Sequence, residues 1–285
     1  MLPRVDTKSA PAVAAWVQEK FHGLYPDEKT SWLPRLFSEV ADLFEGRHPD
    51  YQAVDLRYHD LEHTLQTTVC LTELLDGRAR RAVTPRLGAR PFQFAIAAVM
   101  LHDAGYLKLR HDGRGTGAKY TFCHVLRSCA LAASYLPTLG ATESEIGGVL
   151  GAISCTGPTK QISRLHFENP LQRFIGCALA TADYLGQMAA PDYPEELEIL
   201  YAEFCESDEY ANVPQERRAF KSADELIART PAFWRSIVLP KLRNDYEGAY
   251  SFLQDTTTGA NAYVEAVERN IAIIESRSAR LAAAS

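Results

Sequence analysis

The sequence predicts an all-α protein. Apolar residues recur at helical spacing along most of its 285 residues, whereas the alternating pattern of half-buried strands is hard to find. Gly and Pro stand mostly between the helical stretches, where turns are expected. The chain is long enough to bury a sizeable core, and its 46% apolar and 23% charged residues are typical of globular proteins.

The periodic pattern divides into ten helical segments. Nothing between them marks a linker, so we expect a single all-helical domain over 1–285. Its core is predicted at 51–190, and 191–285 supplies C-terminal helices that complete the core or a pocket. The predicted helices are 10–24, 31–46, 59–76, 91–104, 120–136, 143–154, 170–189, 194–206, 223–252 and 260–282.

Local signals mark where some of these helices begin or break. Thr142 and Glu145 have the spacing of a capping box, which satisfies N–H groups at a helix start. Thr230 before Pro231 has the pattern of an N-cap followed by a first helical residue. Together with Pro240, Pro231 is expected to break or kink the ninth helix.

Charge and cysteine content narrow the functional classes. The chain has 30 Lys and Arg against 36 Asp and Glu, and its isoelectric point is near 5.8, which argues against an electrostatic binder of nucleic acid or anionic membrane. No uncharged apolar run approaches the ~18 residues of a membrane span, and the N-terminus is a poor signal peptide. Six scattered cysteines without a CxxC pair favour reduced thiols in a cytoplasmic protein over disulfides or cysteine-bound zinc.

One almost wholly apolar helix ends in a charged dipeptide. The segment Phe92–Leu101 is followed by His102 and Asp103, and Asp103 is the only formal charge between Arg90 and Lys108. A helix that is apolar on all sides is central to its fold, so this carboxylate is expected to be desolvated. A His-Asp pair also occurs by chance, and by itself it does not identify a site.

A second apolar helix carries a lone carboxylate near its middle. Asp183 is the only formal charge between Arg173 and Asp192. Burying a carboxylate costs several kcal/mol unless it is paired or bound to a metal. The alternatives are a hydrogen-bonded or salt-bridged core Asp, or a helix face that reaches solvent.

A third segment offers two imidazoles. His59 and His63 are four residues apart, and on a helix they would share one face. An exposed helix start with two incidental histidines is the alternative. Taken with His102, Asp103 and Asp183, however, these residues form a set of nitrogen and oxygen donors that suits a divalent metal ion.

The order of these groups resembles the HD superfamily of metal-dependent phosphohydrolases. Residues 58–63 read Tyr-His-Asp-Leu-Glu-His, which is similar to the Tyr-His-Asn-x-x-His signature of class I cyclic nucleotide phosphodiesterases. The resemblance covers about residues 55–190. It implies an HD-domain, phosphodiesterase-like helical bundle, here with helical extensions at both ends.

The resemblance also implies roles for individual residues. His63, His102, Asp103 and Asp183 would hold a first metal ion, and Asp103 would bridge to a second. His59 would not bind metal but would protonate the leaving oxygen while a metal-activated water attacks phosphorus. One or two divalent ions per chain are implied, of which Zn, Mn, Fe, Ni and Mg all remain candidates.

Several positions depart from the phosphodiesterase pattern. Asp60 replaces the signature Asn, and Tyr106 stands where the family has a further His. The family's acidic and paired-His run is reduced to a single histidine, His124, which is either a ligand of the second ion or a partly buried structural histidine. Arg127 and Lys160 are the first candidates to contact a phosphate, against the alternative of ordinary surface charges.

We therefore expect a metal-dependent phosphohydrolase that cleaves a small-molecule phosphoester. The signature favours a phosphodiesterase with a nucleotide-like substrate, and no nucleic-acid polymer or membrane is expected as a partner. Two alternatives remain: an HD-fold di-iron oxygenase, which needs about four histidines, and a non-catalytic domain that senses a nucleotide or metal. The sequence leaves open whether the chain forms a homo-oligomer.

Overall fold

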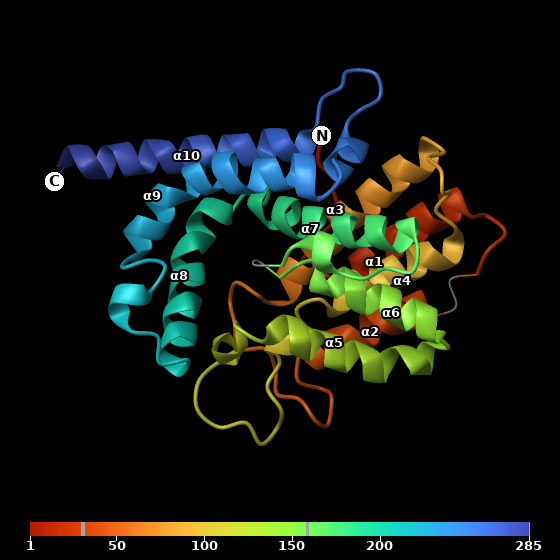
Figure 1. The fold of residues 1–285 in the computed structure, drawn as a ribbon, viewed down its shortest axis with the longest axis horizontal. Coiled ribbons are helices and arrows are strands. Elements are labelled where there is room, and N and C mark those ends of the chain that lie inside the picture. The colour runs from red at the N-terminus through yellow and green to blue at the C-terminus, as the bar shows by residue number, and fades with distance from the viewer. Residues whose placement is uncertain (30–31, 158–159, 285) are drawn as a thin grey trace.

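The computed structural model describes residues 1–29, 32–157 and 160–284, which form helices joined by turns and loops (Figure 1). Within these ranges β-structure is limited to two isolated bridges, so the all-α prediction is confirmed. None of the described helices is both long enough and apolar enough to cross a lipid bilayer. The α-helices are α1 (Ala10–Leu24), α2 (Leu33–Phe44), α3 (Leu61–Arg80), α4 (Ala89–Leu101), α5 (His124–Tyr135), α6 (Glu143–Ser154), α7 (Pro170–Met188), α8 (Tyr193–Tyr210), α9 (Ala223–Phe233) and α10 (Ala262–Ala284).

Most predicted helices occur with shifted ends. The predicted 10–24 and 143–154 match α1 and α6, and the Thr142–Glu145 capping box is present with both of its hydrogen bonds. The helix expected from residue 31 is α2, which begins at Leu33; residue 31 lies outside the described residues. The helical extensions expected on both sides of 51–190 are present, as α1 and α2 before it and α8, α9 and α10 after it.

The ninth predicted helix differs from expectation. Thr230 and Pro231 do not start a helix but lie inside α9, where the Thr230 hydroxyl donates to the Leu226 carbonyl at 2.9 Å. Because proline has no N–H, Pro231 interrupts the helical hydrogen bonds. The chain continues in two π-helical turns, η6 (Trp234–Val238) and η7 (Lys241–Asp245), and a 3-10 helix, η8 (Ala249–Leu253).

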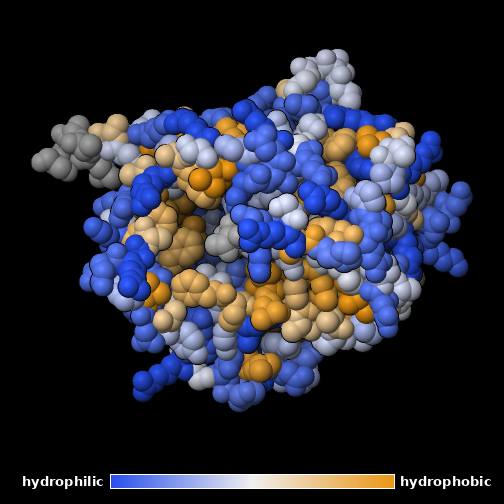
Figure 2. All heavy atoms as spheres, viewed as in Figure 1, coloured by the Kyte–Doolittle hydropathy of each residue, from blue (hydrophilic) through white to orange (hydrophobic). Residues whose placement is uncertain are grey.

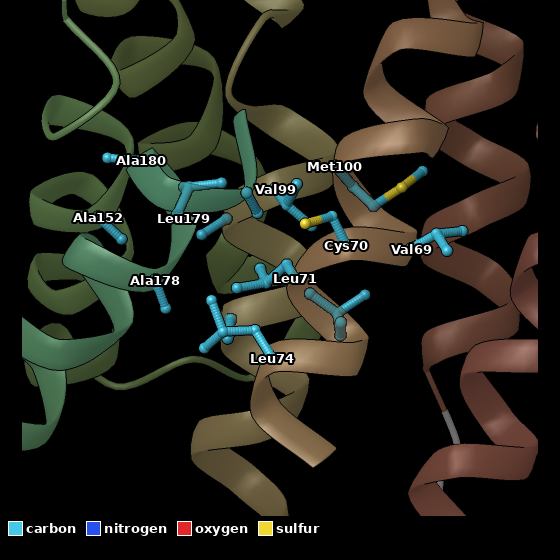
Figure 3. Packing of buried hydrophobic residues seen from close by; sticks show 14 of the residues in the cluster. Val69, Cys70, Leu71, Leu74, Val99, Met100, Ala152, Ala178, Leu179 and Ala180 are labelled. Carbon is cyan, nitrogen blue, oxygen red and sulfur yellow. The ribbon is translucent and has the colours of Figure 1, made fainter. Parts of the chain in front are cut away.

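The centre of the molecule is built from α3, α4, α6 and α7 (Figure 3). Every residue of α4 from Phe92 to Leu101 is buried, which confirms that this apolar helix is central. Leu71 and Leu74 of α3 face Ala178 and Leu179 of α7 across the core. The last turn of α4 and the middle of α7 therefore meet α3 inside the protein.

Three C-terminal helices complete the molecule. α10 packs along α7, α8 and α9 and forms one edge of the molecule, with α8 and α9 beside it (Figure 1). Trp234, just after α9, is fully buried, and its indole N–H donates to Glu268 of α10 at 2.7 Å. This contact anchors the segment after α9 to α10.

Candidate metal centre

Four side chains from three helical regions meet in the interior. His63 lies on α3, Asp183 lies on α7, and His102 and Asp103 follow the last residue of α4. His63 Nε2 is 3.2 Å from Asp103 Oδ2 and 3.3 Å from Asp183 Oδ1. His102 Nε2 is 3.3 Å and 3.4 Å from the same two oxygens. The structure therefore brings together all four residues predicted for the first metal ion.

The ring of His102 is held with a lone pair facing the carboxylates. Its Nδ1 is 2.7 Å from the Val99 carbonyl oxygen, which can only accept a hydrogen bond, so the proton of a neutral ring lies on Nδ1. Nε2 is fully buried and makes no hydrogen bond, although two carboxylate oxygens are near it. An orphaned nitrogen that faces two anionic oxygens is the arrangement that a cation between them would satisfy.

The spacing of the donor atoms also suits a small divalent ion. Donor atoms of His63, His102 and Asp103 all lie within 4.8 Å of one another, and the three residues are buried. Two ligands at about 2.1 Å from one ion, at a tetrahedral angle, are about 3.4 Å apart. The observed separations of 3.2–3.4 Å agree with that value, so these residues could hold a metal ion.

The pKa values show how strongly the site needs a positive charge. Burial by itself would lower the pKa of His63, but the carboxylates of Asp103 and Asp183 outweigh it and raise that pKa to about 10. Burial opposes ionisation of Asp183, yet the imidazoles of His102 and His63 lower its pKa to about 2. The pKa of Asp103 is likewise held well below its usual value by the two imidazoles. Either protons or a cation can balance the two carboxylates.

His59 lies next to this cluster but not on α3. Asp60 accepts the N–H of His63 at 3.0 Å and caps the helix, which begins at Leu61. The prediction that His59 and His63 share a helix face is therefore wrong, because the cap places His59 before the first turn. The two rings still lie close, with centroids 5.8 Å apart.

A carboxylate from α8 orients His59. Glu203 Oε2 is 2.6 Å from His59 Nδ1, and Glu203 Oε1 accepts the backbone N–H groups of Arg57 and Tyr58 at 3.1 and 2.8 Å. Only 8% of the Glu203 side chain is exposed. The carboxylate therefore fixes the ring of His59 with Nδ1 as the donor and leaves Nε2 for chemistry.

An aromatic ring lies between two of the histidines. Tyr106 stacks on His59 at 4.6 Å and on His124 at 4.4 Å between ring centroids. His124 Nδ1 is 2.7 Å from the Thr121 carbonyl, and its Nε2 is 3.8 Å from Asp103 Oδ1. Burial lowers the pKa of His124. His124 therefore faces the Asp103 oxygen that is turned away from His63 and His102.

The comparisons with known proteins do not identify a family. The chain matches no family model and no curated protein.

A cavity of about 570 Å³ opens directly onto the cluster. His59, His63, Asp103, His124 and Asp183 all contribute to its lining. The opposite walls come from α8, α9 and the turns after α9. Figure 2 shows a hollow with tan and orange walls at the part of the surface where Figure 1 places α8 and α9. Its volume is in the range of small-molecule sites.

Two predicted substrate contacts lie elsewhere. Arg127 does not line the cavity: its guanidinium donates to the carbonyls of Gly105 and Leu107, both at 2.7 Å, and lies 3.6 Å from the ring centroid of Tyr120. It thereby holds the turn that follows Asp103. Lys160 is exposed and does not line the cavity either.

Sequence reasoning expected C-terminal helices to complete the core or a pocket but missed Glu203 of α8. Leu197, Leu200 and Phe204 form a stripe at helical spacing, and all three line the cavity. Glu203 lies one turn after Leu200, at the edge of that stripe. A carboxylate at the edge of an apolar stripe was the available signal, but α8 is rich in acidic residues, which hides it.

Proposed function

We propose that this protein is a metal-dependent hydrolase of phosphoesters, of the HD type. The orphaned Nε2 of His102, facing the carboxylates of Asp103 and Asp183, carries the proposal. The order of the four donors along the chain and the cavity that opens onto them support it. The six cysteines are free, which favours a cytoplasmic location.

In this proposal His63, His102, Asp103 and Asp183 hold a divalent ion. When bound, such an ion lowers the pKa of water and neutralises phosphate charge. His59 lines the same cavity and donates a proton to the leaving oxygen, because an imidazole has a suitable pKa near neutral pH. Glu203 keeps the ring in the required orientation through Nδ1.

His124 is the candidate ligand of a second ion. It faces Asp103 Oδ1, whereas His63 and His102 face Oδ2, which supports the proposal that Asp103 would help to hold both ions. Tyr106 occupies the position at which the resemblance expects a further histidine, and its ring stacks on His124. We therefore assign the second ion weaker binding than the first.

Metal analysis combined with a hydrolysis screen tests this function. Protein reconstituted with Mn, Zn, Fe or Mg is expected to retain at least one ion per chain and to cleave a generic aryl phosphodiester. Asp183→Asn is expected to lose both the ion and the activity. Asp27→Asn, at an exposed position in the turn after α1, is expected to keep both. Wild-type protein without bound metal after reconstitution would refute the proposal.

A further inference from the structure

We infer that the cavity selects a phosphoester of an uncharged, apolar alcohol or phenol, in preference to a nucleotide with several phosphates. This inference rests on the proposed function, because it places the phosphoryl group at the metal centre. It concerns the rest of the substrate, which must occupy the space between the cluster and helices α8 and α9. The wall of that space opposite the metal centre is mainly apolar and carries few basic side chains.

The wall opposite the metal centre is apolar. Its side chains come from α8, α9, η6 and the loop before α9, and together they form a continuous hydrocarbon and aromatic surface. Burial of each CH₂ group against such a surface contributes about 0.8 kcal/mol to binding. The main members of this wall are Leu197, Leu200, Phe204, Phe220, Phe233 and Ile237.

The wall offers little positive charge. Among the described lining residues, Arg229 is the only Lys or Arg. Its guanidinium is engaged by Glu225 Oε1 at 3.2 Å and by the Ala219 carbonyl at 3.2 Å, and it lies over the ring of Phe220. A polyphosphate chain needs several charge-assisted donors, and this wall does not supply them.

Basic residues in the nearby loops are also engaged by the protein itself. Lys108 Nζ is 2.6 Å from Asp55 Oδ2 and donates to the Gly115 carbonyl at 2.9 Å. Arg127 is bound to two backbone carbonyls, as described above. Neither side chain lines the cavity.

Several polar groups of the lining are hydrogen-bonded to the protein itself. The Gln187 amide donates to the Asp183 carbonyl at 2.9 Å and accepts the hydroxyl of Tyr58, so both ends of the amide already have a partner in the protein. Hydroxyls of lining threonines donate to carbonyls of their own helical segments; these are Thr121, Thr156 and Thr230. The cavity is therefore expected to select its substrate by shape and by apolar contact.

Carboxylates next to the cluster also disfavour a polyanion. A smaller cavity of about 150 Å³ shares His63 and Gln187 with the large one and is lined by Asp60, Glu62 and Glu196. Asp192 adds a fourth carboxylate, and the basic residues of this lining are Lys8 and Arg57. Carboxylates therefore outnumber cations in the smaller cavity. A substrate with one phosphoryl group meets less repulsion than one with three.

Binding of phosphonates tests the inference. In these compounds a P–C bond that the protein cannot hydrolyse replaces the P–O–C bond of the ester. Methyl-, butyl-, octyl- and phenylphosphonate are titrated calorimetrically into Mn-loaded protein, with α,β-methylene-ADP as the polyanionic comparison. We expect Kd to fall by up to about fourfold for each added methylene until the cavity is filled. Phenylphosphonate is expected to bind more tightly than methylphosphonate, and α,β-methylene-ADP more weakly than octylphosphonate.

Two matched isoleucines supply the control. Ile237 lines the cavity and is 45% exposed, whereas Ile273 lies on α10 outside the lining and is 42% exposed, so both tolerate a polar residue similarly. Ile237→Asn is expected to weaken octylphosphonate binding several-fold, and Ile273→Asn to leave it unchanged. A Kd that does not depend on chain length, or tighter binding of α,β-methylene-ADP, overturns the inference. Retained chain-length dependence in a protein that hydrolyses no phosphoester refutes the hydrolase proposal and leaves the cavity preference standing.

Discussion

Glu203 and His59 lie 144 residues apart in the chain, yet Oε2 of the first is 2.6 Å from Nδ1 of the second. The contact joins α8 to the segment just before α3 at the edge of the metal centre. Since Glu203 also accepts two backbone N–H groups from that segment, it fixes both the ring and the chain that carries it.

Replacing Glu203 with Gln is expected to lower kcat by about 10- to 100-fold with little change in KM. The amide can keep a hydrogen bond but removes the carboxylate that fixes the ring of His59. Because His59 is proposed to protonate the leaving oxygen, the loss should be larger for an alkyl leaving group than for 4-nitrophenolate, which a purely structural role would not cause. Glu209→Gln, at a largely exposed position of α8, is the control and should leave both quantities unchanged.

His59→Asn is expected to depend on the leaving group. For an alkyl leaving group we expect kcat to fall by about 10²- to 10⁴-fold, because the leaving alkoxide then lacks a proton donor. For 4-nitrophenolate, which leaves without protonation, the loss should be much smaller. Metal content should stay the same in both cases, as measured by elemental analysis. Equal losses for both leaving groups would contradict the assignment of His59 as the acid.

Gly105→Ala is expected to destabilise the protein by about 1–3 kcal/mol. A Cβ at this position would lie 1.9 Å from the His124 carbonyl oxygen and 2.7 Å from the Ser128 nitrogen, so the start of α5 must shift. Gly147→Ala on α6 is the matched control: it has no neighbour within 4 Å and should stabilise by about 0.5–1 kcal/mol. Denaturant unfolding of both variants measures the difference.

Glu145 at the start of α6 should make stability depend on pH. Burial would raise its pKa, but hydrogen bonds from Arg90 and Thr142 outweigh burial and lower it. A carboxylate with a lowered pKa stabilises the fold above its unfolded pKa, near 4.5, and loses this contribution as the pH falls through its folded value.

Glu145→Gln is therefore expected to cost about 0.5–1 kcal/mol at pH 7 and almost nothing near pH 3. Urea unfolding of the wild type and the variant at several pH values measures this difference in the free energy of unfolding. Glu143→Gln, in the first turn of the same helix, should show a smaller difference, because it lacks the pair with Arg90. A difference for Glu145→Gln that is independent of pH would show that the charge is not responsible.

The convergence of His63, His102, Asp103 and Asp183 was predictable because these residues break a strong pattern. Asp103 and Asp183 are single charges in long apolar stretches, and a buried carboxylate needs a partner wherever the helices pack. The position of His59 was predicted less well, since Asp60 is a strong N-cap and starts α3 two residues later than expected.

Contacts between distant parts of the chain could not be read from spacing. The many acidic residues of α8 hide Glu203, because its burial depends on the contact of α8 with the distant segment that precedes α3. Arg127 was expected at the substrate, but its guanidinium donates hydrogen bonds to backbone carbonyls. An arginine in the sequence does not show whether its hydrogen-bond acceptor is a bound ligand or the protein backbone.

The donors of the metal centre come from α3, α7 and the end of α4, whereas most of the opposite wall comes from α8, α9 and the turns after them. In the proposed function, reaction type and substrate choice are thus encoded in separate stretches of the gene. Mutational libraries confined to 197–237 can diversify the accepted esters without touching the ion, provided that Glu203 is kept.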